Sequence, residues 1–388
     1  MISLTILGVS GSIGQQSVKV IKDNIQEFSL IGVSVNTNGE YLNQLLEEFK
    51  TIKYVCIGVK MDLNYYKNKY KKIMFFQGDE GLKELCKIKE NDLIVNALVG
   101  FVGLRPTIEA IKNGIDLALA NKESLVVAGD LINKLLVEND VEIFPIDSEH
   151  SAIYQCLKGE HYQEVRRLVI TSSGGAFRDK TLEELENVTV EEALKHPNWK
   201  MGSKITIDCA TMVNKGLEVI EAHHLFNFDY NKIDVVMHLE SVVHSMVEFN
   251  DGGFKAQIGM PNMEIPILFA LSKGHHLPKY DANLMLNKPF SLNFRPIDFK
   301  KYEALLLAYE VGKLGGSYPI VYNAANEVAV EEFLNRKISF LSIVKVIKEC
   351  IKIHEKVNIF SLEDIIKVDK STRILAYKIC NNIMGGRV

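Results

Sequence analysis

The sequence predicts an α/β protein with an N-terminal doubly wound parallel sheet, a central α+β domain with a mixed sheet and a C-terminal helical bundle. Three observations support this prediction. Before residue 148, short apolar runs alternate with segments of helical periodicity, as in successive βαβ units. From Arg167, strand-like runs are separated by polar helical stretches. After Phe299, nearly every segment has helical periodicity.

Apolar runs of strand length locate the elements of the two sheets. In the first sheet they cover residues 4–7, 30–35, 54–58, 93–96, 116–118 and 141–145, and in the second 168–171, 235–239, 243–249 and 254–258. Residues 13–24 repeat apolar side chains at helical spacing. Residues 274–296 hold three prolines and little periodicity, which is typical of a linker. These patterns predict domains at 1–147, 148–273 and 299–388, with a linker at 274–298.

Composition excludes several classes of partner. The 388 residues carry 45 basic and 49 acidic side chains, a formal net charge of −4, so no nucleic-acid partner is expected. No apolar run approaches the ~20 residues that span a bilayer, so no membrane partner is expected either. The six cysteines form no CxxC pair, which argues against a zinc knuckle or a disulfide framework and favours a reducing cytoplasm.

A glycine-rich turn follows the first predicted strand and opens the first predicted helix. Residues Gly8–Gly14 read GVSGSIG, and in this context glycines allow close backbone approach while the helix N-terminus offers N–H groups to a pyrophosphate. The spacing departs from GxGxxG, and a purely structural turn is the alternative. The position favours a Rossmann-like dinucleotide site. Asn36–Asn38, after the second strand, hold no carboxylate that would repel a 2′-phosphate, which favours NADP over NAD.

Two polar segments follow later strands of the first sheet, at the edge where open α/β sheets bind ligands. Lys122, between Asn121 and Glu123, can hold a substrate oxygen, although a solvated loop fits equally well. Asp147 and Glu149 end an apolar strand, and alternate residues of a strand point to one side, so their carboxylates can converge on a cation. Oxygen ligands favour Mg²⁺ or Mn²⁺ over zinc. A solvated acidic turn is the alternative.

Three segments of the central domain carry further candidates. Ser173, before two glycines, can donate to a phosphate, or the segment is a plain glycine turn. The loop from His196 to Gly202 contains the only tryptophan, Trp199, which suits either a cover over a ligand or an anchor in the core. In the segment 214–218, an asparagine and a lysine suit an anion and a glutamate could supply a third carboxylate. A helix start on the surface is the alternative there.

Together these segments resemble the 1-deoxy-D-xylulose 5-phosphate reductoisomerase family. The resemblance continues through residues 244–247, 259–261 and 323–327, so it covers practically the whole chain in order. It implies an enzyme of the non-mevalonate isoprenoid pathway that rearranges 1-deoxy-D-xylulose 5-phosphate and reduces the product with NADPH to 2-C-methyl-D-erythritol 4-phosphate. A metal- and NADP-dependent dehydrogenase of a sugar phosphate or hydroxy acid, without isomerisation, is the alternative.

The resemblance also implies roles for individual positions. The metal ligands would be Asp147, Glu149 and Glu218, and the catalytic groups would be these three with Lys122 and His196. The sugar phosphate would contact Lys122, Ser148, Glu149, Ser173, His196, Trp199, Met201, Asn214, Lys215 and Glu218. NADPH would contact Ser10, Gly11, Ser12, Ile13, Asn38, Asn121, Glu123 and Gly202. A homodimer is expected.

The chain departs from the family at two positions that matter for binding. Many members have Gly-Lys where this chain has Asn36-Thr37, which leaves the contacts to the 2′-phosphate open. Cys209 stands where many members have a phosphate-binding serine, and a thiol is a weak donor.

Overall fold

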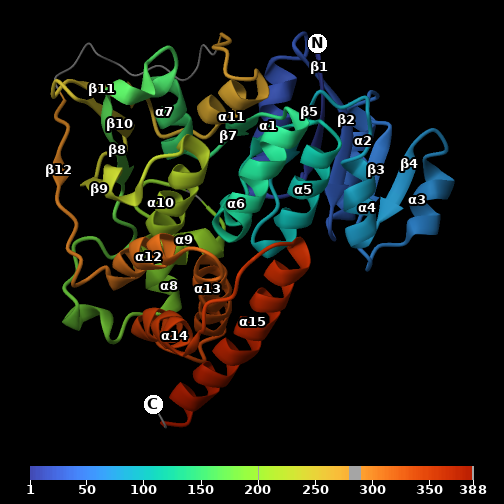
Figure 1. The fold of residues 1–388 in the computed structure, drawn as a ribbon. Helices are drawn as coiled ribbons and strands as arrows, with labels where there is room; N and C mark the ends of the chain where they lie inside the picture. The colour runs from blue at the N-terminus through green and yellow to red at the C-terminus, as the bar shows by residue number, and fades with distance from the viewer. Residues whose placement is uncertain (200, 279–289, 387–388) are drawn as a thin grey trace. The chain divides into compact units, whose positions relative to one another are not determined.

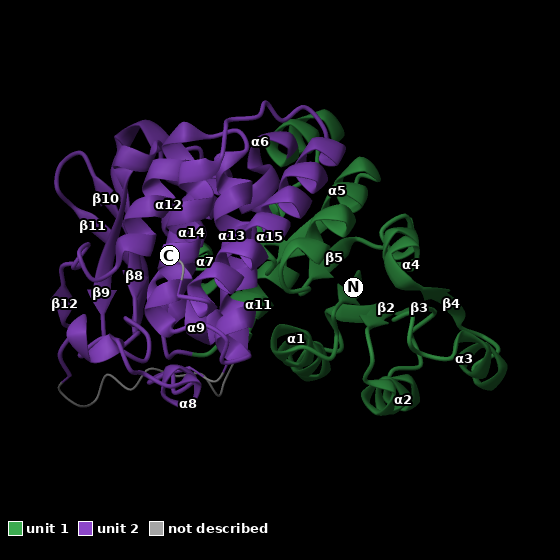
Figure 2. Ribbon diagram, turned by 90° about the horizontal axis from the view of Figure 1, so that it is seen from below, with its two compact units in different colours: residues 1–124, 132–151, 262–282 green, residues 125–131, 152–261, 283–388 purple. Residues whose placement is uncertain are grey.

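The computed structural model describes residues 1–199, 201–278 and 290–386. The chain forms two compact units, coloured separately in Figure 2. Unit 1 comprises residues 1–124, 132–151 and 262–282, and unit 2 comprises residues 125–131, 152–261 and 283–388. The division into domains at 1–147, 148–273 and 299–388 stays a prediction, and part of the predicted linker, 279–289, lies outside the described residues.

Unit 1 contains a seven-stranded parallel sheet in the order β4-β3-β2-β1-β5-β6-β7 (Figure 1). Its strands are β1 Ile2–Leu7, β2 Phe28–Val35, β3 Tyr54–Ile57, β4 Met74–Gln77, β5 Leu93–Asn96, β6 Asp116–Leu119 and β7 Ile143–Pro145. The strand order reverses between β1 and β5, which is the switch point where doubly wound sheets bind ligands. The predicted parallel sheet is confirmed, and β4 is an additional strand.

Helices cover both faces of this sheet, so its central strands are largely buried and mostly apolar. Figure 2 shows α1, α2 and α3 on one face and α4 and α5 on the other. The helices are α1 Ser12–Asp23, α2 Gly39–Glu48, α3 Leu63–Lys69, α4 Gly78–Leu85, α5 Leu104–Lys112, α6 Lys122–Asn139 and α11 Glu264–Leu271. The middle of α6 belongs to unit 2, and the helix is kinked at Ala128.

Unit 2 contains the predicted mixed sheet, in the order β11-β10-β8-β9-β12. Its strands are β8 Val165–Ser172, β9 Ile233–His238, β10 Val243–Phe249, β11 Phe254–Ile258 and β12 Phe294–Arg295. Strands β8 and β9 pair in parallel, and the other pairs are antiparallel. The short edge strand β12 lies within the segment for which the sequence predicts only a linker.

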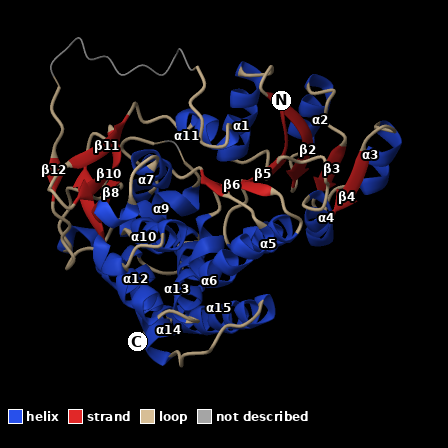
Figure 3. Ribbon diagram, turned by 45° about the horizontal axis from the view of Figure 1, so that its top comes forward, coloured by secondary structure: helices blue, strands red, loops and turns tan. Residues whose placement is uncertain are grey.

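The helices of unit 2 are α8 Val190–Ala193, α9 Ser203–Thr211, α10 Val213–Phe226, α12 Glu303–Leu314, α13 Tyr318–Leu334, α14 Phe340–Ile353 and α15 Leu362–Met384, together with most of α7 Ser148–Leu157. The four helices that follow β12, α12 to α15, are long, as the predicted helical bundle requires (Figure 3). Helix α13 packs against both α14 and α15. None of the described helices combines the length and apolar character needed to cross a membrane.

Candidate functional site

The glycine-rich turn between β1 and α1 presents an uncapped helix N-terminus. Gly8 has a φ of +81°, and a Cβ at Gly14 would lie 2.4 Å from the Gly8 carbonyl oxygen. The backbone N–H of Gly8 donates to Ser34 Oγ at 2.8 Å, which ties the turn to β2. Gly11 precedes the helix without a side-chain cap, and the first turn holds no acidic residue. The turn carries Ser10 to Ile13 and is shaped for a pyrophosphate.

The loop after β2 is neutral, as the sequence predicts. Asn38 begins α2 as its N-cap, because its Oδ1 accepts a hydrogen bond from the Tyr41 N–H at 3.1 Å. Asn36 and Thr37 bring no charge, so no carboxylate of this loop would oppose a 2′-phosphate.

Asn121 fixes the loop at the C-terminal end of β6. Its Oδ1 accepts from the Ser124 N–H at 3.2 Å, and its Nδ2 donates to the carbonyl oxygens of Leu98 and Gly100 at 3.0 and 2.9 Å. The same Nδ2 lies 3.0 Å from Glu123 Oε2. The two residues predicted to contact the cofactor therefore hold each other and the loop after β5.

Lys122 forms an ion pair with Asp147, and both side chains are nearly buried. Burial alone would raise the pKa of Asp147, but the positive charges of Lys122 and His150 and a hydrogen bond with Glu149 outweigh it and hold the pKa below its ordinary value. Asp147 is therefore ionised at neutral pH.

The carboxylates of Asp147 and Glu149 converge, although by another route than the sequence predicts. Strand β7 ends at Pro145 and α7 begins at Ser148, so the two acids flank a strand-to-helix junction and not the end of a strand. Oxygen atoms of the two carboxylates lie within 4.8 Å of each other, and Ser148 Oγ donates to Glu149 Oε2 at 2.6 Å. This oxygen-rich donor set fits Mg²⁺ or Mn²⁺.

In unit 2, Glu218 is buried beside an amide and an ammonium group. Asn214 Nδ2 donates to Glu218 Oε1 at 2.5 Å, and Lys215 Nζ lies 2.5 Å from Glu218 Oε2. The spacing of three and four residues places all three side chains on one face of α10. Met212, at a φ of +62°, separates α10 from α9. The alternative of an exposed helix start is wrong, because these side chains are buried.

The loop that contains Trp199 is fastened at its start by His196. His196 Nδ1 accepts the backbone N–H groups of Asn198 and Trp199 at 3.2 and 3.0 Å, so its proton is on Nε2, which lies 3.0 Å from Ser173 Oγ. Burial, together with the charges of Arg178 and Lys215, lowers the pKa of His196 to about 4. His196 is therefore neutral at pH 7 and donates to Ser173.

The same loop also reaches the turn between β9 and β10. Asn198 Nδ2 donates to the Leu239 carbonyl oxygen at 2.8 Å and to Ser241 Oγ at 2.7 Å. The ring of Trp199 is half-buried, with its centroid 6.4 Å from that of His244. Met201 and Gly202 follow, and Gly202 is the N-cap of α9; the intervening Lys200 lies outside the described residues.

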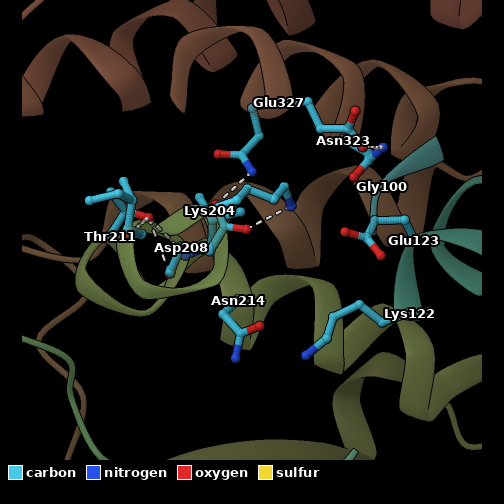
Figure 4. A network of polar contacts seen from close by, with 12 residues as sticks. Gly100, Lys122, Glu123, Lys204, Asp208, Thr211, Asn214, Asn323 and Glu327 are labelled. Carbon is cyan, nitrogen blue, oxygen red and sulfur yellow. Dashed lines mark hydrogen bonds and ion pairs between the residues drawn. The ribbon is translucent and has the colours of Figure 1, made fainter. Parts of the chain in front are cut away.

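Sequence reasoning missed the residues that hold these segments in place. Arg178 Nη1 donates to the carbonyl oxygens of Ser173 and Leu239 at 3.2 and 3.3 Å. It thereby joins the loop after β8 that contains Ser173, called the serine loop below, to the β9–β10 turn. Asp208 of α9 is buried and accepts a hydrogen bond from Lys204 at 2.7 Å (Figure 4). It also accepts one from Asn326 Nδ2 at 2.8 Å. No local pattern predicts the contact between Asp208 and Asn326, because the two residues are 118 positions apart in the chain.

The structure thus gathers the predicted residues in separate groups within each unit. Unit 1 holds the glycine turn, the neutral loop after β2 and the group formed by Lys122, Asp147, Ser148 and Glu149. Unit 2 holds the pair of Ser173 and His196 with the Trp199 loop, and the group formed by Asn214, Lys215 and Glu218.

Comparison with known proteins gives one consistent result. A family model described as 1-deoxy-D-xylulose 5-phosphate reductoisomerase matches residues 4–129. Two models of C-terminal domains of the same enzyme match residues 143–226 and 258–375. Proteins of that name from Geobacillus sp. (strain WCH70) and Bacillus subtilis (strain 168) are 48% and 49% identical to this chain. They cover 95% and 96% of it, over 97% and 98% of their own lengths.

Solved structures agree with these relatives. A DOX-P reductoisomerase in complex with NADPH, fosmidomycin and magnesium is similar with a TM-score of 0.92 and 37% identity, covering 99% of both chains. The enzyme from Zymomonas mobilis in complex with NADPH is similar with a TM-score of 0.91 and 38% identity, covering 98% of this chain and 99% of its own.

Proposed function

The chain belongs to the 1-deoxy-D-xylulose 5-phosphate reductoisomerase family, and we propose that Asp147, Glu149 and Glu218 form the metal centre at which it works. It is an NADPH-dependent oxidoreductase that converts 1-deoxy-D-xylulose 5-phosphate to 2-C-methyl-D-erythritol 4-phosphate with magnesium as metal cofactor. The convergence of two carboxylates beside Lys122 is the observation that carries the proposal.

The third ligand in this proposal is Glu218. It is buried in the second turn of α10, and its two oxygens face Asn214 and Lys215, donors that suit the substrate phosphate. When bound, the cation supplies Lewis-acid polarisation of the ketone and of a neighbouring hydroxyl. Lys122 then neutralises negative charge that develops on a substrate oxygen, and Ser148 hydrogen-bonds a sugar hydroxyl.

The remaining residues bind and cover the substrate. Ser173, whose hydroxyl faces His196, joins Asn214 and Lys215 in holding the phosphate. The loop with Trp199 and Met201 excludes water while the aldehyde intermediate awaits hydride. NADPH lies along the glycine turn, with Ser10, Gly11, Ser12, Ile13, Asn38, Asn121, Glu123 and Gly202 as its contacts.

The organisation of the working enzyme is part of the proposal. Residues 1–147 bind NADPH, residues 148–273 carry the metal, phosphate and covering loop, and residues 299–388 form the helical domain after the linker 274–298. The enzyme works in the cytoplasm as a homodimer. Contact with a second copy is supported by Phe254 and Ile258, which are exposed at the two ends of the edge strand β11 and lie on the same side of it.

Metal binding to two matched variants tests the ligand set. Glu218→Gln removes the proposed ligand, whereas Glu221→Gln makes the same change at the other buried glutamate of α10 that could serve as a metal ligand. Titration calorimetry with Mn²⁺ should show weaker binding for Glu218→Gln and near-native binding for Glu221→Gln, with both melting temperatures checked. If only Glu221→Gln lost the metal, the proposed third ligand would be wrong.

A further inference from the structure

The loop after β2 lacks the charge that its proposed ligand needs. In Rossmann-like sheets this loop meets the adenosine ribose. A phosphate group carries roughly −1.5 to −2 charges at pH 7. Asn36, Thr37 and Asn38 are all neutral, and the Asn38 carboxamide oxygen is used to cap α2. A cation for the 2′-phosphate must come from elsewhere.

The loop after β3 touches this loop directly. Strands β2 and β3 pair in parallel, with Val35 beside Ile57, so both end at the same edge of the sheet. The Gly58 N–H donates to the Val35 carbonyl oxygen at 2.9 Å. A Cβ at Gly58 would lie 2.1 Å from the Asn36 carbonyl oxygen, so only glycine permits this approach.

Lys60 lies at the tip of that second loop, in a fixed turn. The Met61 N–H donates to the Gly58 carbonyl oxygen at 3.0 Å, and Gln77 Nε2 donates to the carbonyl oxygens of both residues at 2.8 and 3.2 Å. Lys60 is exposed, and it has neither a hydrogen bond nor an ion pair with any residue that the structure describes.

The charged side chains of Asp62 and Lys69, which lie close to Lys60 in the sequence, already have partners within the protein. Asp62 Oδ1 accepts the backbone N–H groups of Asn64 and Tyr65 at 2.9 and 3.1 Å, as the N-cap of α3. Lys69, on the same helix, lies 3.2 Å from Asn43 Oδ1 and over the ring of Tyr70.

We propose that Lys60 binds the 2′-phosphate of NADPH and thereby sets the preference of this chain for NADPH over NADH. The inference rests on the proposed placement of NADPH along the glycine turn. The turn of residues 58–61 fixes the backbone from which the Lys60 side chain extends, and the loop after β2 would supply neutral polar groups to the same phosphate.

Direct binding measurements separate this role from a structural one. Dissociation constants for NADPH and NADH would be measured by titration calorimetry for the wild type, Lys60→Ala and Lys60→Arg. Lys72→Ala is the matched control, because it removes the same charge from an exposed residue just before β4. This residue lies at the amino-terminal ends of the parallel strands, whereas Lys60 follows the carboxyl end of β3. Lys60→Ala should weaken NADPH binding by about tenfold or more and leave NADH binding unchanged. Lys60→Arg and Lys72→Ala should bind both nucleotides like the wild type.

Two results would overturn the role of Lys60. An equal loss of NADPH and NADH binding in Lys60→Ala would make the residue structural, and an unchanged NADPH affinity would show that another group holds the phosphate. A wild type that bound neither nucleotide would instead overturn the proposed function, and the role of Lys60 with it.

Discussion

His196 Nε2 lies 3.0 Å from Ser173 Oγ, which joins the start of the Trp199 loop to the serine loop after β8. Because Nδ1 of the same ring accepts two backbone N–H groups, the imidazole must stay neutral to keep both sets of contacts. A proton on Nδ1 would face two donors and would break the turn that begins the loop.

The lowered pKa of His196 predicts a loss of stability in mild acid. His196 takes up a proton near pH 6.5 in the unfolded chain and only near pH 4 in the folded chain. Its contribution to the free energy of unfolding is therefore complete above pH 6.5 and is lost as the pH falls towards 4. His196→Asn keeps an acceptor near Nδ1 but cannot titrate. Urea unfolding should therefore show that the free energy of unfolding decreases more from pH 7 to pH 5 in the wild type than in this variant. Equal decreases would show that a group other than His196 causes the loss of stability.

Trp199 reports on the covering loop because it is the only tryptophan of the chain. A metal-chelating phosphonate should shift or quench its emission when NADPH and the divalent cation are present. Trp199→Ala should weaken binding of this ligand by up to about 3 kcal/mol, through loss of apolar cover. Emission that is already blue-shifted and does not respond to the ligand would make the residue a core anchor.

Removal of the metal should abolish turnover without unfolding the protein. The carboxylates of Asp147 and Glu149 are part of a hydrogen-bonded group that includes Ser148 and Lys122, so the fold does not depend on the cation alone. Treatment with a chelator should stop NADPH oxidation, and Mg²⁺ or Mn²⁺ should restore it, while circular dichroism stays constant. Full activity in the chelated enzyme would contradict the metal centre.

The neutral loop after β2 predicts how cofactor preference can be changed. Thr37→Asp would place a carboxylate beside the 2′-phosphate and repel it, so the ratio of kcat/KM for NADPH over NADH should fall by about tenfold. Thr37→Asn is the control, since it has a similar size and no charge. An unchanged ratio in the aspartate variant would show that the 2′-phosphate lies away from this loop.

The sequence determined the features that depend on local periodicity and turn chemistry. Alternating apolar runs and helical segments specified the parallel sheet, because each strand and helix must bury its own apolar face. The glycines at positions 8 and 14 specified the turn, because Gly8 has a φ of +81° and the backbone leaves no room for a Cβ at Gly14. Strand β12 has only two residues, too few for a period to be recognised. Strand β4 was not predicted, although it has four residues like the predicted strands β3, β5 and β6.

Tertiary structure decided the contacts between residues that are far apart in the chain. Lys122 meets Asp147 because they follow β6 and β7, which pair in the sheet, and Asp208 meets Asn326 because α9 packs against α13. No local pattern encodes such pairs. The pKa of His196 likewise depends on burial and on charges from other elements, Arg178 and Lys215. Electrostatic interaction acts through space, so the ionisation of these groups follows from the packed fold and not from their neighbours in sequence.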